Sequence, residues 1–112
     1  METTTATAYT TVTPDVFARD IKKSNMYILD VRHPDEFKEG HIANAHNLDV
    51  MDSDFLAQAE KSLPKDKTIA VYCGTGKRSG MASDILSKNG YKILNLEGGL
   101  TEWTEHHLQV VK

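Results

Sequence analysis

The chain has 112 residues, enough for one domain but too few for a second independent hydrophobic core, so we expect residues 1–112 to form a single domain. Its 13 basic and 16 acidic residues give a formal net charge of −3, which argues against a general electrostatic affinity for nucleic acid or an anionic membrane surface. No apolar run approaches the roughly 18 residues of a transmembrane helix. Cys73 is the single cysteine, which excludes an intramolecular disulfide and any zinc site that needs several thiolates.

The N-terminal residues read as a loose lead-in. Residues 3–13 contain seven threonines, and we expect residues 1–9 to precede the regular fold, with a short strand near Tyr9–Val12. The segment METTTATAYTT has neither the positive charge nor the apolar stretch of a secretory signal, so we expect the chain in the cytoplasm. Pro14 follows a threonine, as in a helix with an N-cap and proline at its first position, and this predicts a helix to about Lys23.

The middle of the chain alternates apolar runs with helical patterns. Residues 27–31 form an apolar run that ends in charge, which predicts a buried strand. Pro34 starts a short helix that Gly40 ends, and residues 45–48 read as another short strand. Ser53 is placed to cap the amphipathic helix that follows it.

The second half of the chain repeats this alternation. Residues 68–72 are the clearest strand, and residues 78–89 carry apolar side chains at helical spacing. Residues 92–96 form the last expected strand, after which Gly98-Gly99 turns the chain into a final helix. Because the strands are continuous apolar runs that alternate with helices, the pattern predicts the α/β class, with a parallel sheet covered by helices on both faces.

Residues with reactive or charged side chains follow two of the expected strands. Ligands of open α/β sheets bind beyond the carboxyl ends of the strands, where Asp30 and Arg32 follow one strand and Cys73 follows another. The loop after the strand at 68–72 consists of Cys73, Gly74, Thr75, Gly76, Lys77, Arg78 and Ser79. Its glycines allow backbone N–H groups to turn inward around an anion, and the next helix points its positive end at the same place.

This loop predicts a reactive sulfur. Nearby positive charge favours the nucleophilic thiolate of Cys73 over the thiol, so no general base is needed. A cysteine at a strand end is, taken alone, more often a small buried apolar residue, and Lys77 and Arg78 alone would indicate only a solvated helix start. Positive charge at the start of a helix is unfavourable, however, unless an anion is bound nearby. We therefore interpret the loop as an anion site around a reactive cysteine.

Three motifs in this order resemble the rhodanese-homology (sulfurtransferase) family in its single-domain form, over residues 10–107. They are Leu29-Asp30-Val31-Arg32 with Pro34-Asp35-Glu36-Phe37 and Gly40-His41-Ile42, then Cys73-Gly74-Thr75-Gly76-Lys77-Arg78-Ser79, and last Asn95-Leu96-Glu97-Gly98-Gly99 with Trp103. The second of these looks like the Cys-x-x-Gly-x-Arg-Ser active-site loop of the family. The resemblance implies a five-stranded parallel sheet with helices on both faces.

The resemblance also implies a sulfur-carrying, catalytic Cys73. Its thiolate would take the outer sulfur of thiosulfate or a similar small anionic donor and pass it, as a persulfide, to cyanide or another thiophilic acceptor. The loop amides from Gly74 to Ser79 would hold the persulfide, while Lys77 and Arg78 would attract the donor. In this family, loops of the present length resemble the sulfur-transferring members and loops one residue longer resemble phosphatase and arsenate-reductase relatives, so phosphatase activity ranks low.

Asp30 and Arg32 are the expected supporting residues. Two interpretations are open: one of them, above all Asp30, holds the loop electrostatically through Arg78, or they form an ordinary cap or surface ion pair. Two positions depart from the family pattern. Asn44 stands where glycine is common and is expected to tolerate a left-handed backbone, whereas His46 stands where an apolar residue is common.

Two further functions compete with sulfur transfer to small molecules. The chain is also consistent with a sulfur-relay or protein-interaction module that delivers persulfide to an acceptor protein, and with a redox sensor built on an exposed, readily ionised thiol. We expect neither a cofactor nor a metal ion, because the five histidines form no cluster with metal-ligand spacing. No nucleic-acid or membrane partner is expected.

Overall fold

Five parallel strands form one sheet at the centre of the molecule. The computed structural model describes residues 9–112, and the expected lead-in of residues 1–9 therefore lies almost wholly outside the described residues. The strands, in the sheet order β1-β5-β4-β2-β3, are β1 (Thr10–Val12), β5 (Lys92–Leu96), β4 (Thr68–Tyr72), β2 (Met26–Asp30) and β3 (His46–Asn47). Every neighbouring pair is parallel, which confirms the sheet that the apolar runs predict.

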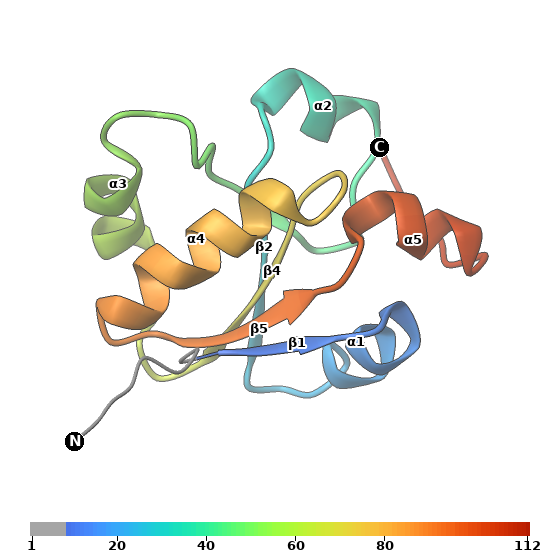
Figure 1. The fold of residues 1–112 in the computed structure, drawn as a ribbon, viewed down its shortest axis with the longest axis horizontal. Helices are drawn as coiled ribbons and strands as arrows, with labels where there is room; N and C mark the ends of the chain where they lie inside the picture. Colours follow the sequence, from blue (N-terminus) through green and yellow to red (C-terminus); the bar gives the residue numbers. More distant parts are fainter. Residues whose placement is uncertain (1–8) are drawn as a thin grey trace.

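Five helices cover this sheet. They are α1 (Pro14–Asp20), α2 (Pro34–Glu39), α3 (Phe55–Ser62), α4 (Lys77–Lys88) and α5 (Gly99–Glu105). Figure 1 shows α3 and α4 on one side of the sheet, α1 and α5 on the other, and α2 beyond the carboxyl end of β2. The predicted architecture of helices on both faces is confirmed.

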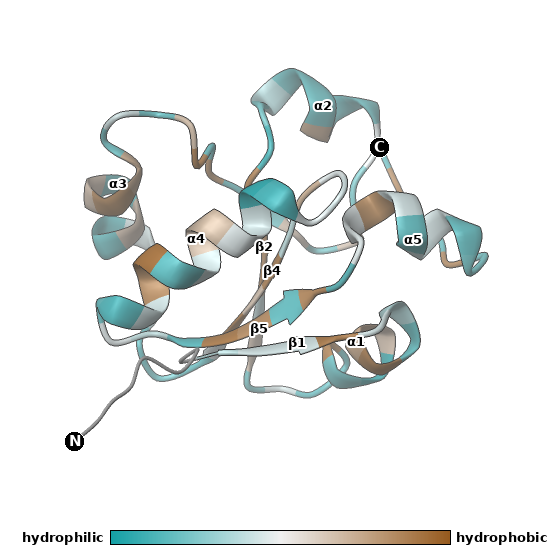
Figure 2. Cartoon of the chain, in the orientation of Figure 1, coloured by the Kyte–Doolittle hydropathy of each residue, from teal (hydrophilic) through white to brown (hydrophobic). Residues whose placement is uncertain are grey.

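The hydrophobic core consists of two layers, one on each face of the sheet. Successive residues of β4 alternate between them: Val71 packs in the layer beneath α3 and α4, whereas Ala70 and Tyr72 pack in the layer beneath α1 and α5. Trp103 of α5 is buried in the second layer and meets Phe17 edge to face. In Figure 2 the helices alternate teal and brown segments, as elements with one buried face do.

Some predicted boundaries are wrong by a few residues. α1 ends at Asp20 rather than Lys23, because the chain must turn back before Asn25, whose carbonyl accepts the Thr68 N–H at the start of β4. The N-cap of α3 is Asp54 rather than Ser53. β3 has two residues instead of four, since this edge strand pairs only with the last two residues of β2.

Both departures from the family pattern are accommodated in the fold. Asn44 has a φ of 71°, the left-handed backbone that was expected at this position. His46 stacks on the ring of Tyr27 with ring centroids 4.3 Å apart, so an aromatic contact replaces aliphatic packing on the edge strand.

A close backbone approach joins α5 to the loop after β4. The N–H groups of Leu100 and Thr101 donate to the carbonyls of Cys73 (2.9 Å) and Gly74 (3.0 Å). Gly99, which precedes Leu100, has a φ of +60°. A Cβ on Gly99 would come within 2.5 Å of the Cys73 carbonyl oxygen and 2.6 Å of the Gly74 backbone. Glycine is therefore required at this position, because the obstructing atoms are backbone.

We expect Gly99→Ala to destabilise the protein by about 2–4 kcal/mol, since it combines a left-handed backbone with a backbone clash. Gly80 of α4 is the matched control, because a Cβ there meets nothing within 4 Å. Gly80→Ala should be neutral or stabilising by up to about 1 kcal/mol through helix propensity. Urea unfolding of the three proteins measures both effects, and equal destabilisation by the two variants would contradict the close approach.

Candidate active site

The loop from Cys73 to Ser79 closes over the cysteine sulfur. Cys73 directly follows β4, and Gly76 adopts a left-handed conformation (φ 104°) as the N-cap of α4. This turn brings the Gly76 N–H back onto Cys73, to which it donates a hydrogen bond with N and Sγ 3.1 Å apart. One inward amide of the expected anion site is therefore directed at the sulfur, and such a donor favours a negative charge there.

The sulfur is covered. The Cys73 side chain has no exposed surface and packs with the core residues of the layer beneath α3 and α4. Thr75, at the tip of the loop, is exposed, while Gly74 and Gly76 are partly exposed. The exposed thiol assumed by the redox-sensor hypothesis is therefore wrong, because the side chain packs into the core and the Gly76 N–H lies against the sulfur.

Arg78 is held by Glu36 rather than by Asp30. Arg78 Nη1 donates to Glu36 Oε1 (2.7 Å) and Nη2 to Oε2 (3.0 Å), a bidentate pair that joins α4 to α2. The hydrogen bonds and charge of Arg78 lower the pKa of Glu36 to about 2. The guanidinium also lies against the loop, because a Cβ on Gly74 would be 3.3 Å from Arg78 Nη2.

Asp30 and Arg32 form a separate, buried ion pair. Arg32 Nη2 donates to Asp30 Oδ2 (2.7 Å), Arg32 Nε contacts both carboxylate oxygens, and the Arg32 N–H donates to Oδ1 (2.9 Å). The same Nη2 reaches the carbonyl of Gly40 (2.6 Å), which fixes the turn after α2. The pair is buried, so the interpretation as a surface ion pair is wrong. The hydrogen bonds of Asp30 go to Arg32 and not to Arg78, so a route to the loop through Arg78 is not formed, and electrostatic support of the loop by Asp30 stays a prediction.

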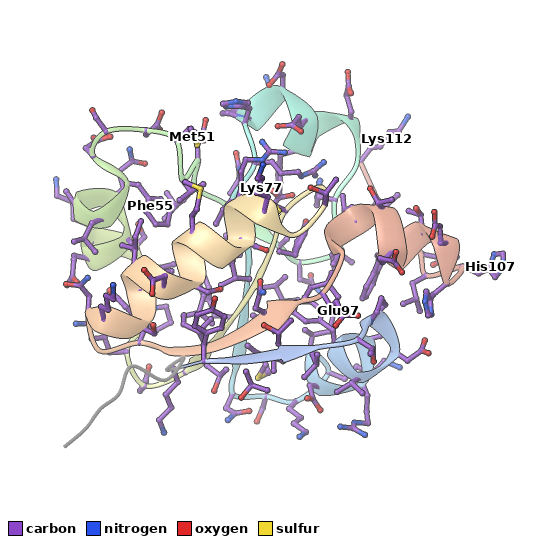
Figure 3. All side chains as sticks on the ribbon, viewed as in Figure 1. Met51, Phe55, Lys77, Glu97, His107 and Lys112 are labelled. Carbon is purple, nitrogen blue, oxygen red and sulfur yellow. The ribbon has the colours of Figure 1, made fainter. Side chains whose placement is uncertain are left out.

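Lys77 and Ser79 have different surroundings. Lys77 is exposed at the start of α4, beside the loop, as Figure 3 shows, and it forms no ion pair within residues 9–112. Ser79 is fully buried, and its hydroxyl donates to the carbonyl of Gly76 (3.2 Å). Lys77 is thus available to an anion from solvent, whereas Ser79 stabilises the turn that covers the sulfur.

Glu36 is the supporting residue that sequence reasoning did not identify. It was part of the first motif, but its distance in sequence from Arg78 gave no sign of contact. The sheet order decides the contact, since β2 and β4 are neighbours and their carboxyl ends bring α2 to the start of α4. The signal in the sequence was the position of Glu36, a carboxylate in the first turn of the helix that follows the motif at the end of β2.

The described residues hold neither a metal-binding cluster nor a membrane-spanning helix. Residues 9–112 contain no group of three or more histidine, cysteine, aspartate or glutamate side chains placed to bind a metal ion. Within the same part of the chain, every helix is too short or too polar to cross a membrane.

Comparison with known proteins agrees with this fold. A rhodanese-like domain model matches residues 13–106. The crystal structure of a rhodanese-related protein from Thermoplasma volcanium superposes with a TM-score of 0.81 and 37% identity, covering 92% of this chain and 98% of that one.

Curated relatives include proteins named for sulfur transfer. A putative mitochondrial thiosulfate sulfurtransferase of Schizosaccharomyces pombe is 42% identical over 89 residues, which are 70% of this chain and 63% of that protein. The thiosulfate sulfurtransferase GlpE of Coxiella burnetii is 35% identical over 78% of this chain and 79% of its own length. With the family match over most of the chain and the cysteine loop in place, the chain belongs to the rhodanese-like domain family.

Proposed function

We propose that this protein is a sulfurtransferase that moves sulfane sulfur from thiosulfate or a similar anionic donor to cyanide or a thiol acceptor through a persulfide on Cys73. The observation that carries the proposal is the Gly76 N–H donated to Cys73 Sγ inside a loop of the sulfur-transferring length. A hydrogen-bond donor directed at a sulfur stabilises the anion that both the thiolate and the persulfide present. The names of the relatives support the same chemistry.

The proposed reaction has two displacement steps. The Cys73 thiolate attacks the outer sulfur of thiosulfate, the S–S bond of the donor breaks, and sulfite leaves with the electron pair. Cyanide then attacks the outer sulfur of the Cys73 persulfide, so that thiocyanate leaves and the thiolate returns. Charge is conserved in each step, and no proton transfer or external redox partner is required.

The two cations of the loop, Arg78 and Lys77, have different roles. Glu36 neutralises Arg78 and fixes its guanidinium against Gly74, so Arg78 maintains the loop. Lys77 keeps its charge exposed and attracts the donor. Because the sulfur has no exposed surface, the donor reaches it only when the loop opens, and the glycines at 74 and 76 allow its backbone to move.

A protein acceptor is the second candidate destination for the sulfur. Met81 lies one turn after Lys77 on α4, and it is 45% exposed. An exposed apolar side chain one turn from an exposed cation suits contact with another protein better than capture of a small acceptor. Stable persulfide loading with slow turnover by cyanide would favour this destination.

Replacing the nucleophile tests the proposal directly. We expect Cys73→Ser to reduce thiocyanate formation from thiosulfate and cyanide to the uncatalysed rate, because serine cannot carry the sulfane sulfur. Intact-mass measurement after exposure to thiosulfate should show about +32 Da on the wild type and no addition on the variant. Equal activity in the two proteins, or no mass addition to the wild type, would refute the persulfide mechanism.

Lys77→Gln should raise the KM for thiosulfate about two- to fivefold while kcat changes little, since an exposed charge contributes on this scale. The increase should shrink at high salt because the attraction is screened. Lys88→Gln, at the opposite end of α4, is the matched control, because Lys88 forms only an exposed pair with Asp84. A similar KM in both variants would contradict the role of Lys77.

Glu36→Gln should lower the free energy of unfolding by about 1 kcal/mol at pH 7, a figure reduced for the partial exposure of the pair. Because the folded pKa of Glu36 is about 2, well below its ordinary value of 4.5, the stabilisation is present above pH 4.5 and disappears as the pH falls toward 2. Thermal melts of both proteins at pH 7 and pH 3 measure the change. A constant difference across this range would show that the Glu36 carboxylate does not act through its charge.

A further inference from the structure

A histidine–aspartate pair lies at the same edge of the sheet as Cys73. His33 follows β2 and Asp49 follows β3, the two strands next to β4 on one side of the sheet. His33 Nδ1 and Asp49 Oδ2 are 2.5 Å apart. Because parallel strands end at a common edge, this pair belongs to the region where ligands of such sheets bind.

The two partners of this pair differ in exposure. The Asp49 side chain is 7% exposed and its other oxygen accepts the Met51 N–H (2.8 Å), whereas the His33 side chain is 51% exposed. A nearly buried carboxylate needs a partner for its charge; among the described residues His33 forms the direct ion pair with Asp49, and Arg78 lies farther off with its own partner Glu36. With Nδ1–H donated to Asp49, the Nε2 edge of the ring remains free of hydrogen bonds to residues 9–112.

The pair is connected to the sulfur loop through one residue. The His33 N–H donates to Glu36 Oε1 (3.1 Å), and this oxygen also accepts Nη1 of Arg78, whose guanidinium lies against Gly74. His33 is therefore one hydrogen bond from the ion pair that fixes the loop.

The charged side chains around the Cys73 loop nearly cancel one another. Arg78 is neutralised by Glu36, and Arg32 by Asp30, so Lys77 supplies the net positive charge of the site. When His33 is protonated, its charge cancels that of Asp49, and the site keeps the one positive charge of Lys77. Loss of the His33 proton leaves the Asp49 carboxylate uncompensated and removes the net positive charge.

We propose that His33, held by Asp49, is a positioning residue for the anionic sulfur donor: its protonated ring cancels the Asp49 charge, and deprotonation creates a negative charge that repels donor from the loop. This inference rests on the proposed function, because the donor is the anion concerned. Protonation of His33 favours entry of the anion, and Lys77 is the cation that attracts the donor.

Three charged groups, each from a different segment, act on His33. The hydrogen bond and charge of Asp49 raise the pKa of His33, the charge of Glu36 acts in the same direction, and the charge of Arg78 opposes them. Because the pKa is raised above its ordinary value of 6.5, the protonated form persists to higher pH, and the preference for anions is lost as the pH rises through the folded value.

The test compares two alkylating reagents on the same sulfur. Iodoacetate is an anion and iodoacetamide is neutral, and both react with the Cys73 thiolate, so the ratio of their rates cancels ionisation of the cysteine and any opening of the loop. Intact-mass spectrometry from pH 5.5 to pH 9 should show this ratio falling about threefold in the wild type, the size expected for one exposed charge.

Three variants separate the pair from other causes. His33→Gln should give a low ratio that no longer depends on pH, since Asp49 is then unpaired throughout. Asp49→Asn should retain the fall but move it to lower pH, because the ring loses the charge that favours its proton. His106→Gln is the matched control: His106 also faces an aspartate, with Nδ1 3.5 Å from Asp15 Oδ2 in another part of the fold, and the variant should behave as the wild type does.

A wild-type ratio that is constant with pH, or a fall that survives in His33→Gln, would overturn the proposal. Alkylation needs no sulfur transfer, so the outcome is independent of the thiocyanate assay. If the rate ratio falls as predicted but no persulfide forms, the proposed function is refuted and the role of His33 is retained. If a persulfide forms but the rate ratio is constant with pH, only the role of His33 is refuted.

Discussion

The hydrogen bond from the Gly76 amide to the sulfur of Cys73 is the contact around which the site is organised. It requires β4 to end at Tyr72, a left-handed residue at Gly76, and a loop that returns to its own starting point. α5 holds the same loop by its close approach at Gly99, because the N–H groups of Leu100 and Thr101 donate to the carbonyls of Cys73 and Gly74. The loop is therefore held from outside by backbone while its own amide is directed inward.

Ion pairs of different burial have different tasks at this edge of the sheet. The fully enclosed Asp30–Arg32 pair shapes the chain between β2 and the turn at Gly40, and its removal from water is compensated by several hydrogen bonds. The half-exposed Glu36–Arg78 pair fixes the loop. Because these pairs cancel their own charges, the proposed attraction of an anionic donor rests on Lys77 and on the protonation of one exposed histidine. A site with so little net charge is sensitive to a single proton.

The fold class could be read from local pattern because each element carries its own signal. The apolar runs of β2, β4 and β5 and the helical spacing after Arg78 follow from burial of strands on both faces and of helices on one. The ends of elements were less predictable. α1 stops at Asp20, before the expected Lys23, because the Asn25 carbonyl must accept the Thr68 N–H at the start of β4. The residues around Lys23 carry no sequence signal of this contact.

Residue type and short-range spacing were enough to predict the α/β class and to single out Cys73 with the glycine-rich loop around it. Which carboxylate holds Arg78, the burial of the sulfur and the contact of His33 with Asp49 are visible only in the folded molecule. The two side-chain contacts, His33 with Asp49 and Glu36 with Arg78, join residues 16 and 42 positions apart in the chain. They form because the sheet order brings the ends of β3, β2 and β4 together, and that order follows from packing of the whole domain rather than from any local pattern.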